Sequence, residues 1–364
     1  MGADRSLALA GPRGVIRVLS ALAALLLAAP LAAGGEAGPI SLRDQGFFWV
    51  GVHPTPVAAT GAGGGATTGH AIEGQMYVGF QLPAMKRHPY PLVLVHGGGG
   101  QATDWMGTPD GRDGWLDYFL AAGFDVYFVD RPGLGRSPDT GGYGPAGALP
   151  TTELIARLFT AQSRQYPGGG GADTPEVASH TASSEPGLSA SNAVLKADLA
   201  ELLDRIGPAI LVVHSNGAPS AWLAMDARPD LVKGVLAIEP VGISDELAAL
   251  LTFSPALAAG ETLAHEQRPS EAEGLDPCTL QPRGTVRTVP AYAGKRILFV
   301  GSPHSMFTAN IHCLAQQFAE FGADAKLARL TDYGLEGNGH FMNEELNNGE
   351  IATRVFVPWL AAIR

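Results

Sequence analysis

The sequence predicts an α/β protein with a doubly wound, mostly parallel sheet, and three observations favour this class. Short runs of aliphatic and β-branched residues have the continuous apolar character of strands that are buried on both faces. Helical or loop segments separate these runs, and such alternation is typical of parallel sheets. Hydrophobic residues make up 46% of the chain and charged residues 16%, which indicates a globular chain and not an apolar-poor, highly charged disordered one. The runs are residues 90–97, 123–130, 208–215, 233–240 and 295–302.

Two further strands are expected before the parallel part, at residues 46–52 and 75–82, and we expect them to pair antiparallel. The glycine-rich segment 58–74 between them is expected to be a mobile connection. A last strand-like run covers residues 325–330. Helices are predicted at residues 114–122, 195–206, 219–227 and 311–321.

Two long excursions interrupt the alternation of strands and helices. Residues 140–193 contain one expected helix, 151–164, and a loose run over 167–186, whereas residues 242–290 are irregular with one or two helices. Long excursions in this class usually lie above the carboxyl edge of the sheet, where ligands bind. We therefore predict a single domain over 35–364 with lid segments 140–193 and 242–290. Insertion as surface padding is the alternative.

The N-terminal residues have the composition of an export signal. Three arginines precede an apolar run that ends in small residues, so residues 1–34 are predicted to be a signal peptide and the protein to be secreted or periplasmic. A membrane anchor is the alternative, but Pro30 interrupts the run before the ~20 residues needed to span a bilayer. No stable membrane insertion is therefore expected after cleavage.

The net charge limits the possible binding partners, and the two cysteines indicate a disulfide. The net charge is −11, so the chain lacks the basic character that nucleic acids or anionic lipids attract. The two cysteines, Cys278 and Cys313, are predicted to form a disulfide, for which chain entropy predicts roughly 4 kcal/mol of stabilisation. A metal pair is the weaker interpretation because no C-x-x-C or H-E-x-x-H spacing occurs, and no cofactor is expected.

Ser215 is the candidate nucleophile. It directly follows an expected strand and precedes an expected helix, the turn in which a G-x-S-x-G elbow exposes a serine. Small residues flank such a turn because strand and helix approach closely. Gly217 satisfies this requirement, where a larger residue is expected to meet the helix backbone, but Val213 replaces the first glycine and must point along the sheet. A serine that merely ends a strand is the alternative.

A glycine loop follows the expected strand in "LVLVHGGGG", residues 92–100. A strand that ends in His96 and Gly97 before three more glycines is typical of a loop that offers a backbone N–H to an oxyanion. We predict the N–H groups of Gly98 and Asn216 as the two donors. A phosphate loop or a linker is the alternative, although the sequence lacks G-K-[ST].

His340 is the predicted base, since it lies in a glycine-rich loop near the C-terminus, after the last strand. His96 and His214 belong to other strand ends, and His304 follows an earlier strand, where it could line a pocket. Glu239 is the predicted acid because it ends the strand beside that of Ser215, while residues 299–312 contain no carboxylate. A surface glutamate is the alternative. Asp332 and Glu336 are reserve candidates.

These residues, with "HGGGG" and "DRPGLGRS", resemble the α/β-hydrolase superfamily over essentially the whole mature chain. More narrowly, "GQMYV", "TPDGRDGW" and "IEP" are similar to a group of exported bacterial carboxylesterases with a Ser-Glu-His triad. The resemblance implies hydrolysis of small-molecule carboxylic esters through an acyl-enzyme, without a cofactor. Members of that group can carry adjacent cysteines where this chain has Gly98 and Gly99.

Other functions share the same residues. An acyltransferase, or another acyl hydrolase such as a peptidase or perhydrolase, would use an identical triad. A non-catalytic, hydrolase-like binding module is a different class, and it would usually lack a triad member. Dehalogenases and epoxide hydrolases of this fold normally use an aspartate nucleophile, whereas position 215 is serine.

Overall fold

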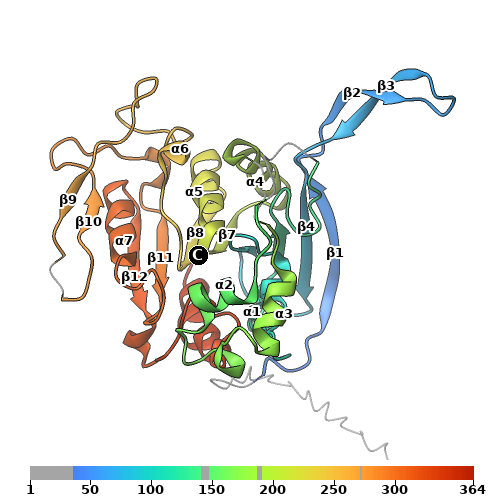
Figure 1. Ribbon diagram of the computed structural model, residues 1–364. Helices are drawn as coiled ribbons and strands as arrows, with labels where there is room; N and C mark the ends of the chain where they lie inside the picture. Colours follow the sequence, from blue (N-terminus) through green and yellow to red (C-terminus); the bar gives the residue numbers. More distant parts are fainter. Residues whose placement is uncertain (1–35, 141–146, 187–190, 271–272) are drawn as a thin grey trace, which may run out of the picture. The chain divides into compact units, whose positions relative to one another are not determined.

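The computed structural model describes residues 36–140, 147–186, 191–270 and 273–364 (Figure 1). The predicted signal peptide, residues 1–34, lies outside the described residues. The main sheet has eight strands in the order β1-β4-β6-β5-β7-β8-β11-β12. Their bounds are Leu42–Val50 (β1), Met76–Pro83 (β4), Leu92–Val95 (β5), Val126–Asp130 (β6), Ala209–His214 (β7), Val232–Ile238 (β8), Arg296–Gly301 (β11) and Asp324–Arg329 (β12).

The strand pairing confirms the doubly wound, mostly parallel sheet. Strands β6, β5, β7, β8, β11 and β12 pair parallel, while β4 pairs antiparallel with both β1 and β6. After β5 the chain first adds β6 on one side and later adds β7 on the other. Ligands of such sheets bind at the carboxyl ends of the strands where this direction reverses. The ends of β5 and β7 are therefore the expected place for a site.

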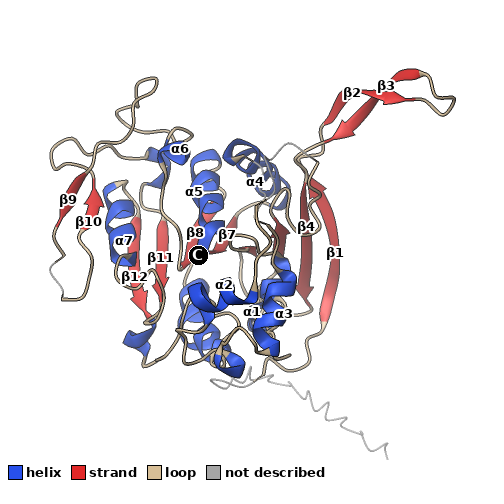
Figure 2. Cartoon of the chain, viewed as in Figure 1, coloured by secondary structure: helices blue, strands red, loops and turns tan. Residues whose placement is uncertain are grey.

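Helices cover both faces of this sheet, because successive side chains of each buried strand point to opposite faces. Figure 2 shows helices on either side of the strands. In β5, Leu92 and Leu94 pack with residues of α1, α8 and α9, whereas Val93 and Val95 pack with residues of α4, α5 and α7. The helix bounds are Trp115–Ala122 (α1), Asn192–Ile206 (α4), Ala218–Ala227 (α5), Ile311–Glu320 (α7), Asn348–Ile351 (α8) and Val357–Ala361 (α9). The four predicted helices are confirmed to within three residues at each end.

The segment 58–74 differs from the expected mobile connection. It belongs to an antiparallel hairpin of β2 (Pro54–Thr60) and β3 (Ala66–Ile72), in which Pro54 pairs with Ile72. Gly64, with φ 81°, lies in its turn. The sequence signal is weak because the paired strands are rich in Ala and Thr and are mostly exposed, so no apolar alternation marks them.

The two excursions contain more regular structure than the sequence indicates. The expected helix 151–164 ends early: α2 (Thr152–Ile155) continues as one π-helical stretch, Ala156–Thr160. The run expected to be loose contains α3 (Pro175–Ser183). Its start signal is local, since Thr174 accepts a hydrogen bond from the Val177 N–H and Pro175 occupies the first turn.

In residues 242–290, α6 (Asp245–Ala248) is a single turn, and β9 (Glu266–Arg268) pairs antiparallel with β10 (Cys278–Leu280). This small sheet was not expected. The predicted disulfide is present: Cys278 is bonded to Cys313 of α7. No helix in the described ranges has the length and apolar character needed to cross a bilayer.

Candidate active site

Ser215 lies in a tight turn between β7 and α5. Its φ is 50°, a left-handed conformation that costs about 1–3 kcal/mol for a residue other than glycine. β7 ends at His214, and α5 begins at Ala218 after one 3₁₀ turn. The turn therefore lifts Ser215 out of the strand at the carboxyl edge of the sheet.

The structure explains which glycine of the elbow pattern is needed. A Cβ at Gly217 would lie 2.3 Å from the His96 carbonyl oxygen and 2.8 Å from that of Val95. The close approach seen here is therefore to the end of β5. Val213 is completely buried in β7 and belongs to the apolar cluster that includes α5. A valine at this position is a core residue and does not obstruct the turn.

The structure brings Ser215, His340 and Glu239 together. Ser215 Oγ lies 3.0 Å from His340 Nε2, and His340 Nδ1 lies 3.4 Å from Glu239 Oε2. Glu239 follows β8, beside β7, and its φ of 47° is also left-handed. Both His340 and Glu239 are buried, at 2% and 0% exposure. A hydroxyl, an imidazole and a carboxylate thus form one chain of polar contacts, in which the imidazole and the carboxylate are buried and the partly buried hydroxyl lines the cavity.

Glu239 is held by two groups of the loop after β11. The Ser302 N–H donates to Oε1 at 2.7 Å, and the Ser305 hydroxyl donates to Oε2. Burial raises the pKa of Glu239 to about 7, and both hydrogen bonds act in the opposite direction. Ser305 could not be predicted as a partner of Glu239, because no pattern in the sequence marks a serine in this loop.

Aromatic rings surround the imidazole of His340. The ring centres of Phe159, Phe307 and Phe341 lie 5.2, 5.3 and 5.3 Å from that of His340. Burial lowers the pKa of His340 to about 3, so the ring is neutral near pH 7 and can accept a proton. His214 donates from Nε2 to the His340 carbonyl oxygen at 3.1 Å, which fixes the backbone that carries the ring.

The glycine loop after β5 packs directly on the serine turn. A Cβ at Gly98 would lie 3.2 Å from Asn216 Cβ. The buried Arg131 guanidinium donates to the carbonyl oxygens of Gly97 at 2.6 Å and Asn216 at 3.1 Å, so it joins the two segments. Burial lowers the Arg131 pKa to about 10, which leaves it cationic at neutral pH. The backbone N–H of Arg131 also donates to His96 Nε2 at 3.0 Å, and His96 directly precedes the glycine loop.

The reserve candidates lie elsewhere. Asp332 and Glu336 are exposed, and Asp332 accepts a hydrogen bond from the Arg329 N–H at 3.1 Å. Neither carboxylate contacts His340 in the described structure. His304 does not line the cavity around Ser215; its N–H donates to the Asn338 carbonyl oxygen at 2.9 Å.

A cavity of about 410 Å³ contains Ser215 and His340. The loop Gly97–Gly100 forms one side of it, and α2 with the π-helical stretch after it contributes an apolar wall. That wall includes Ile155, Leu158 and Phe159. Part of the segment 140–193 therefore borders the candidate site.

A second buried polar cluster lies beside this cavity. His180 of α3 places Nδ1 2.7 Å from Glu344 Oε1, and the Tyr166 hydroxyl donates to Glu344 Oε2 at 2.8 Å. Burial acts to lower the pKa of His180, but the neighbouring Glu344 carboxylate outweighs it and raises the pKa. This cluster ties α3 to the segment after His340. This cluster could not be predicted, because its members come from segments that carry no recognisable sequence pattern.

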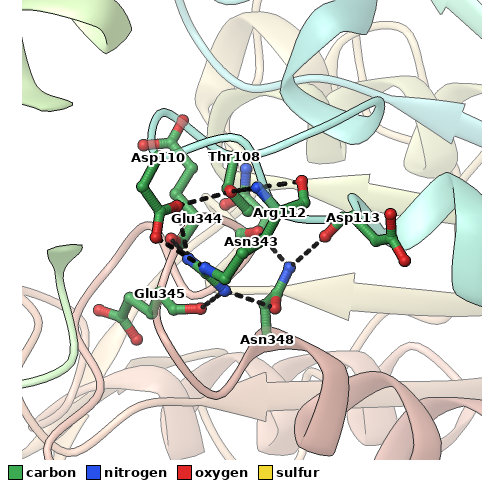
Figure 3. A network of polar contacts seen from close by, with 8 residues as sticks. All are labelled: Thr108, Asp110, Arg112, Asp113, Asn343, Glu344, Glu345 and Asn348. Atoms are coloured by element: carbon green, nitrogen blue, oxygen red, sulfur yellow. Dashed lines mark hydrogen bonds and ion pairs between the residues drawn. The ribbon is translucent and has the colours of Figure 1, made fainter. Parts of the chain in front are cut away.

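Arg112 links the loop before α1 to the residues that follow His340 (Figure 3). Its guanidinium donates to the carbonyl oxygens of Glu344 at 2.8 Å and Glu345 at 3.0 Å, and to the side chain of Asn348 at 2.9 Å. Asp110 accepts from Arg112 Nε at 2.7 Å and orients it. The "TPDGRDGW" stretch therefore anchors the backbone that follows His340.

One group of metal-binding side chain types occurs among the described residues: Cys278, His312 and Cys313. Its two sulfur atoms are bonded to each other, and His312 Nε2 lies 3.2 Å from Cys278 Sγ. Thiolate ligation requires free, deprotonated sulfur, so the intact disulfide does not offer a metal site.

Comparisons with known proteins agree with this architecture. Residues 90–265 match the model of the α/β hydrolase fold family. The chain is 34% identical over 318 residues to the probable secreted lipase phiG of Fungal sp. (strain ATCC 74256), covering 78% of this chain and 85% of that protein. The chain therefore belongs to the α/β-hydrolase family.

A solved structure shares the fold. The chain is similar to a novel bacterial esterase determined at atomic resolution, with a TM-score of 0.64 and 21% identity over 90% of this chain and 98% of that one. At this identity the likeness establishes the arrangement of strands and helices, and activity rests on the site itself.

Proposed function

We propose that the protein is a serine carboxylesterase that hydrolyses small-molecule carboxylic esters through an acyl-enzyme intermediate. The contact of 3.0 Å between Ser215 Oγ and His340 Nε2, on a strained strand-to-helix turn, carries this proposal. The similar fungal protein is a probable secreted lipase, and the bacterial structure is an esterase, which agree with an ester substrate.

In this mechanism Ser215 attacks the ester carbonyl while His340 takes the hydroxyl proton. Glu239 stabilises the imidazolium that forms, and the N–H groups of Gly98 and Asn216 donate to the oxyanion. His340 then returns the proton to the departing alcohol. Water attacks the acyl-enzyme in the same way and releases the acid. Each oxyanion donor typically contributes about 3–4 kcal/mol to lowering the barrier.

The proposal includes the location and the domain organisation. Residues 1–34 act as an export signal, and the mature protein is secreted or periplasmic. The disulfide and the name of the similar secreted lipase support this. Residues 35–364 form one domain, in which 140–193 and 242–290 act as lids. The apolar side chains that 140–193 contributes to the cavity support its role in substrate binding.

Ser215→Ala tests the proposed function. We expect p-nitrophenyl butanoate turnover to fall by about a thousandfold or more, because the nucleophile is lost while the fold remains. Ser220→Ala is the matched control: Ser220 lies on α5, and its buried hydroxyl finds no partner in the described part of the chain. Correctly folded Ser215→Ala with undiminished turnover would refute the proposal.

A further inference from the structure

A second, larger cavity adjoins the one that contains Ser215. Its volume is about 1010 Å³, and Asn216, Val241 and Phe307 line both cavities. Phe307 also packs against His340, with ring centres 5.3 Å apart. A substrate whose carbonyl lies at Ser215 can therefore extend past these three residues into the second cavity.

The lining of this second cavity, here called the polar cavity, includes side-chain amides without partners. Gln317 of α7 is buried, with 8% of its surface exposed, and its side chain lines the cavity. Within the described ranges, the side chains of Gln317, Asn216 and Asn310 make no hydrogen bond to protein. Gln317 is thus mostly enclosed by protein, while its amide faces the cavity with its donors and its acceptor open to a ligand.

The chemistry of the lining favours a neutral ligand with hydroxyl groups. An amide both donates and accepts hydrogen bonds, as a hydroxyl does. Arg131 lines the same cavity as Glu246 and Asp276, so charges of both signs are present and neither an anion nor a cation is selected. An alkyl chain would leave the amides without partners, and the apolar wall beside Ser215 already suits such a chain.

We propose that the polar cavity binds a hydroxyl-bearing part of the ester substrate, with the Gln317 amide as a hydrogen-bond partner of a hydroxyl group. This inference rests on the proposed function, because it assumes an ester carbonyl at Ser215. The hydroxyl groups can belong to the alcohol or to the acyl part of the ester, and the test separates these sources.

Two substrate pairs test the alcohol side and the acyl side. Sorbitol monobutanoate is compared with hexyl butanoate, and ethyl 3,4-dihydroxybutanoate with ethyl butanoate, each by kcat/KM in a pH-stat. We expect Gln317→Leu to lower the ratio of hydroxylated to plain substrate by about fivefold in one pair, because one hydrogen bond is lost. The change in this ratio between variants cancels the intrinsic reactivity of each ester.

Gln316→Leu is the matched control, since Gln316 is the exposed neighbour on α7 and should leave both ratios unchanged. Asn310→Ala is a second variant, at an exposed position of the same cavity, in case Gln317→Leu does not fold. A fall in one pair supports the proposal and assigns the side. Ser215-dependent turnover with unchanged ratios in both pairs would overturn the polar site alone. No Ser215-dependent turnover of any ester would overturn the proposed function and this site with it.

Discussion

Backbone strain marks the two residues at the ends of β7 and β8. Among the described residues, Ser215 and Glu239 are the two with positive φ that are not glycine. Such conformations persist where surrounding contacts determine them, and they concentrate at functional sites. Here the hydrogen bonds from Ser302 and Ser305 fix the Glu239 carboxylate, while the end of β5 packs on the Ser215 turn. These contacts therefore hold Glu239 and Ser215 in their strained conformations.

Ser305→Ala should shift the pH dependence of activity. The Ser305 hydroxyl stabilises the ionised Glu239, so its removal raises the pKa of Glu239 further above its ordinary value. The proposed mechanism needs that carboxylate ionised. The acidic limb of kcat/KM should therefore move to higher pH, with the largest loss of activity below about pH 7 and recovery at higher pH.

The measurement is kcat/KM for p-nitrophenyl butanoate from pH 5 to 9. Ser305→Thr keeps a hydroxyl and should restore the original limb. A uniform loss of activity at every pH would show that Ser305 supports the loop without acting on the Glu239 ionisation.

The positions of the three candidate residues could be predicted because each follows a recognisable sequence signal. Ser215 and Glu239 end buried strands, and His340 lies in a glycine-rich loop near the C-terminus. Ser305 and His180 could not be predicted in this way. Their partners come from distant segments, and a serine or histidine in a loop carries no local pattern that indicates which carboxylate it meets.

At the scale of elements, the loop before α1 holds the segment after His340 in place through hydrogen bonds. Arg112 donates three hydrogen bonds to residues 344–348, and Asp110 orients its guanidinium (Figure 3). Two of these bonds reach backbone carbonyl oxygens, so the interaction fixes the path of the chain. The loop thereby helps to hold the His340 backbone at its distance from Ser215.

Arg112→Gln should loosen this attachment. Hydrogen bonds from a charged group typically contribute about 1.5–3 kcal/mol each, but glutamine can restore part of the network. We expect the free energy of unfolding to fall by roughly 2 kcal/mol and kcat to fall by about tenfold with a smaller change in KM. Urea denaturation and steady-state kinetics measure both. Arg87→Gln, at an exposed position, is the control; unchanged kcat in Arg112→Gln would contradict a positioning role.

Short elements were the part of the fold that the sequence did not indicate. The parallel strands could be predicted because burial on both faces demands continuous apolar runs. The β2–β3 hairpin is mostly exposed, and β9 and β10 are only three residues long each, so neither pair shows such a run. Helix α3 begins with a threonine cap and a proline, which are helix-start signals. The glycine run directly before them instead indicates a loop, so the helix was not expected.

At the scale of the whole molecule, apolar clusters on both faces of one sheet hold the strand ends that carry the site. Ser215 and Glu239 extend from neighbouring buried strands, β7 and β8, which pair directly along six residues. Protein interiors are close-packed, so such strands move little relative to each other. Rigid strands and adaptable loops above them are a general basis for functional sites in this class.

The disulfide adds a covalent restraint between β10 and α7. It joins Cys278 to Cys313 across a sequence separation of 35 residues, for which loop-closure entropy predicts about 4 kcal/mol of stabilisation. Replacing both cysteines by alanine should lower the free energy of unfolding by about that amount. Denaturation of the oxidised protein and of the double variant measures it. Equal midpoints and slopes would contradict a stabilising role.

The most direct test of the central claim is covalent labelling by a fluorophosphonate, followed by peptide mass spectrometry. Such reagents phosphonylate an activated serine hydroxyl. If His340 and Glu239 activate Ser215, one adduct should form per chain, on the peptide that contains Ser215, and His340→Ala should suppress it. Folded protein that stays unlabelled, or that is labelled on another serine, would contradict the assignment of Ser215 as the nucleophile.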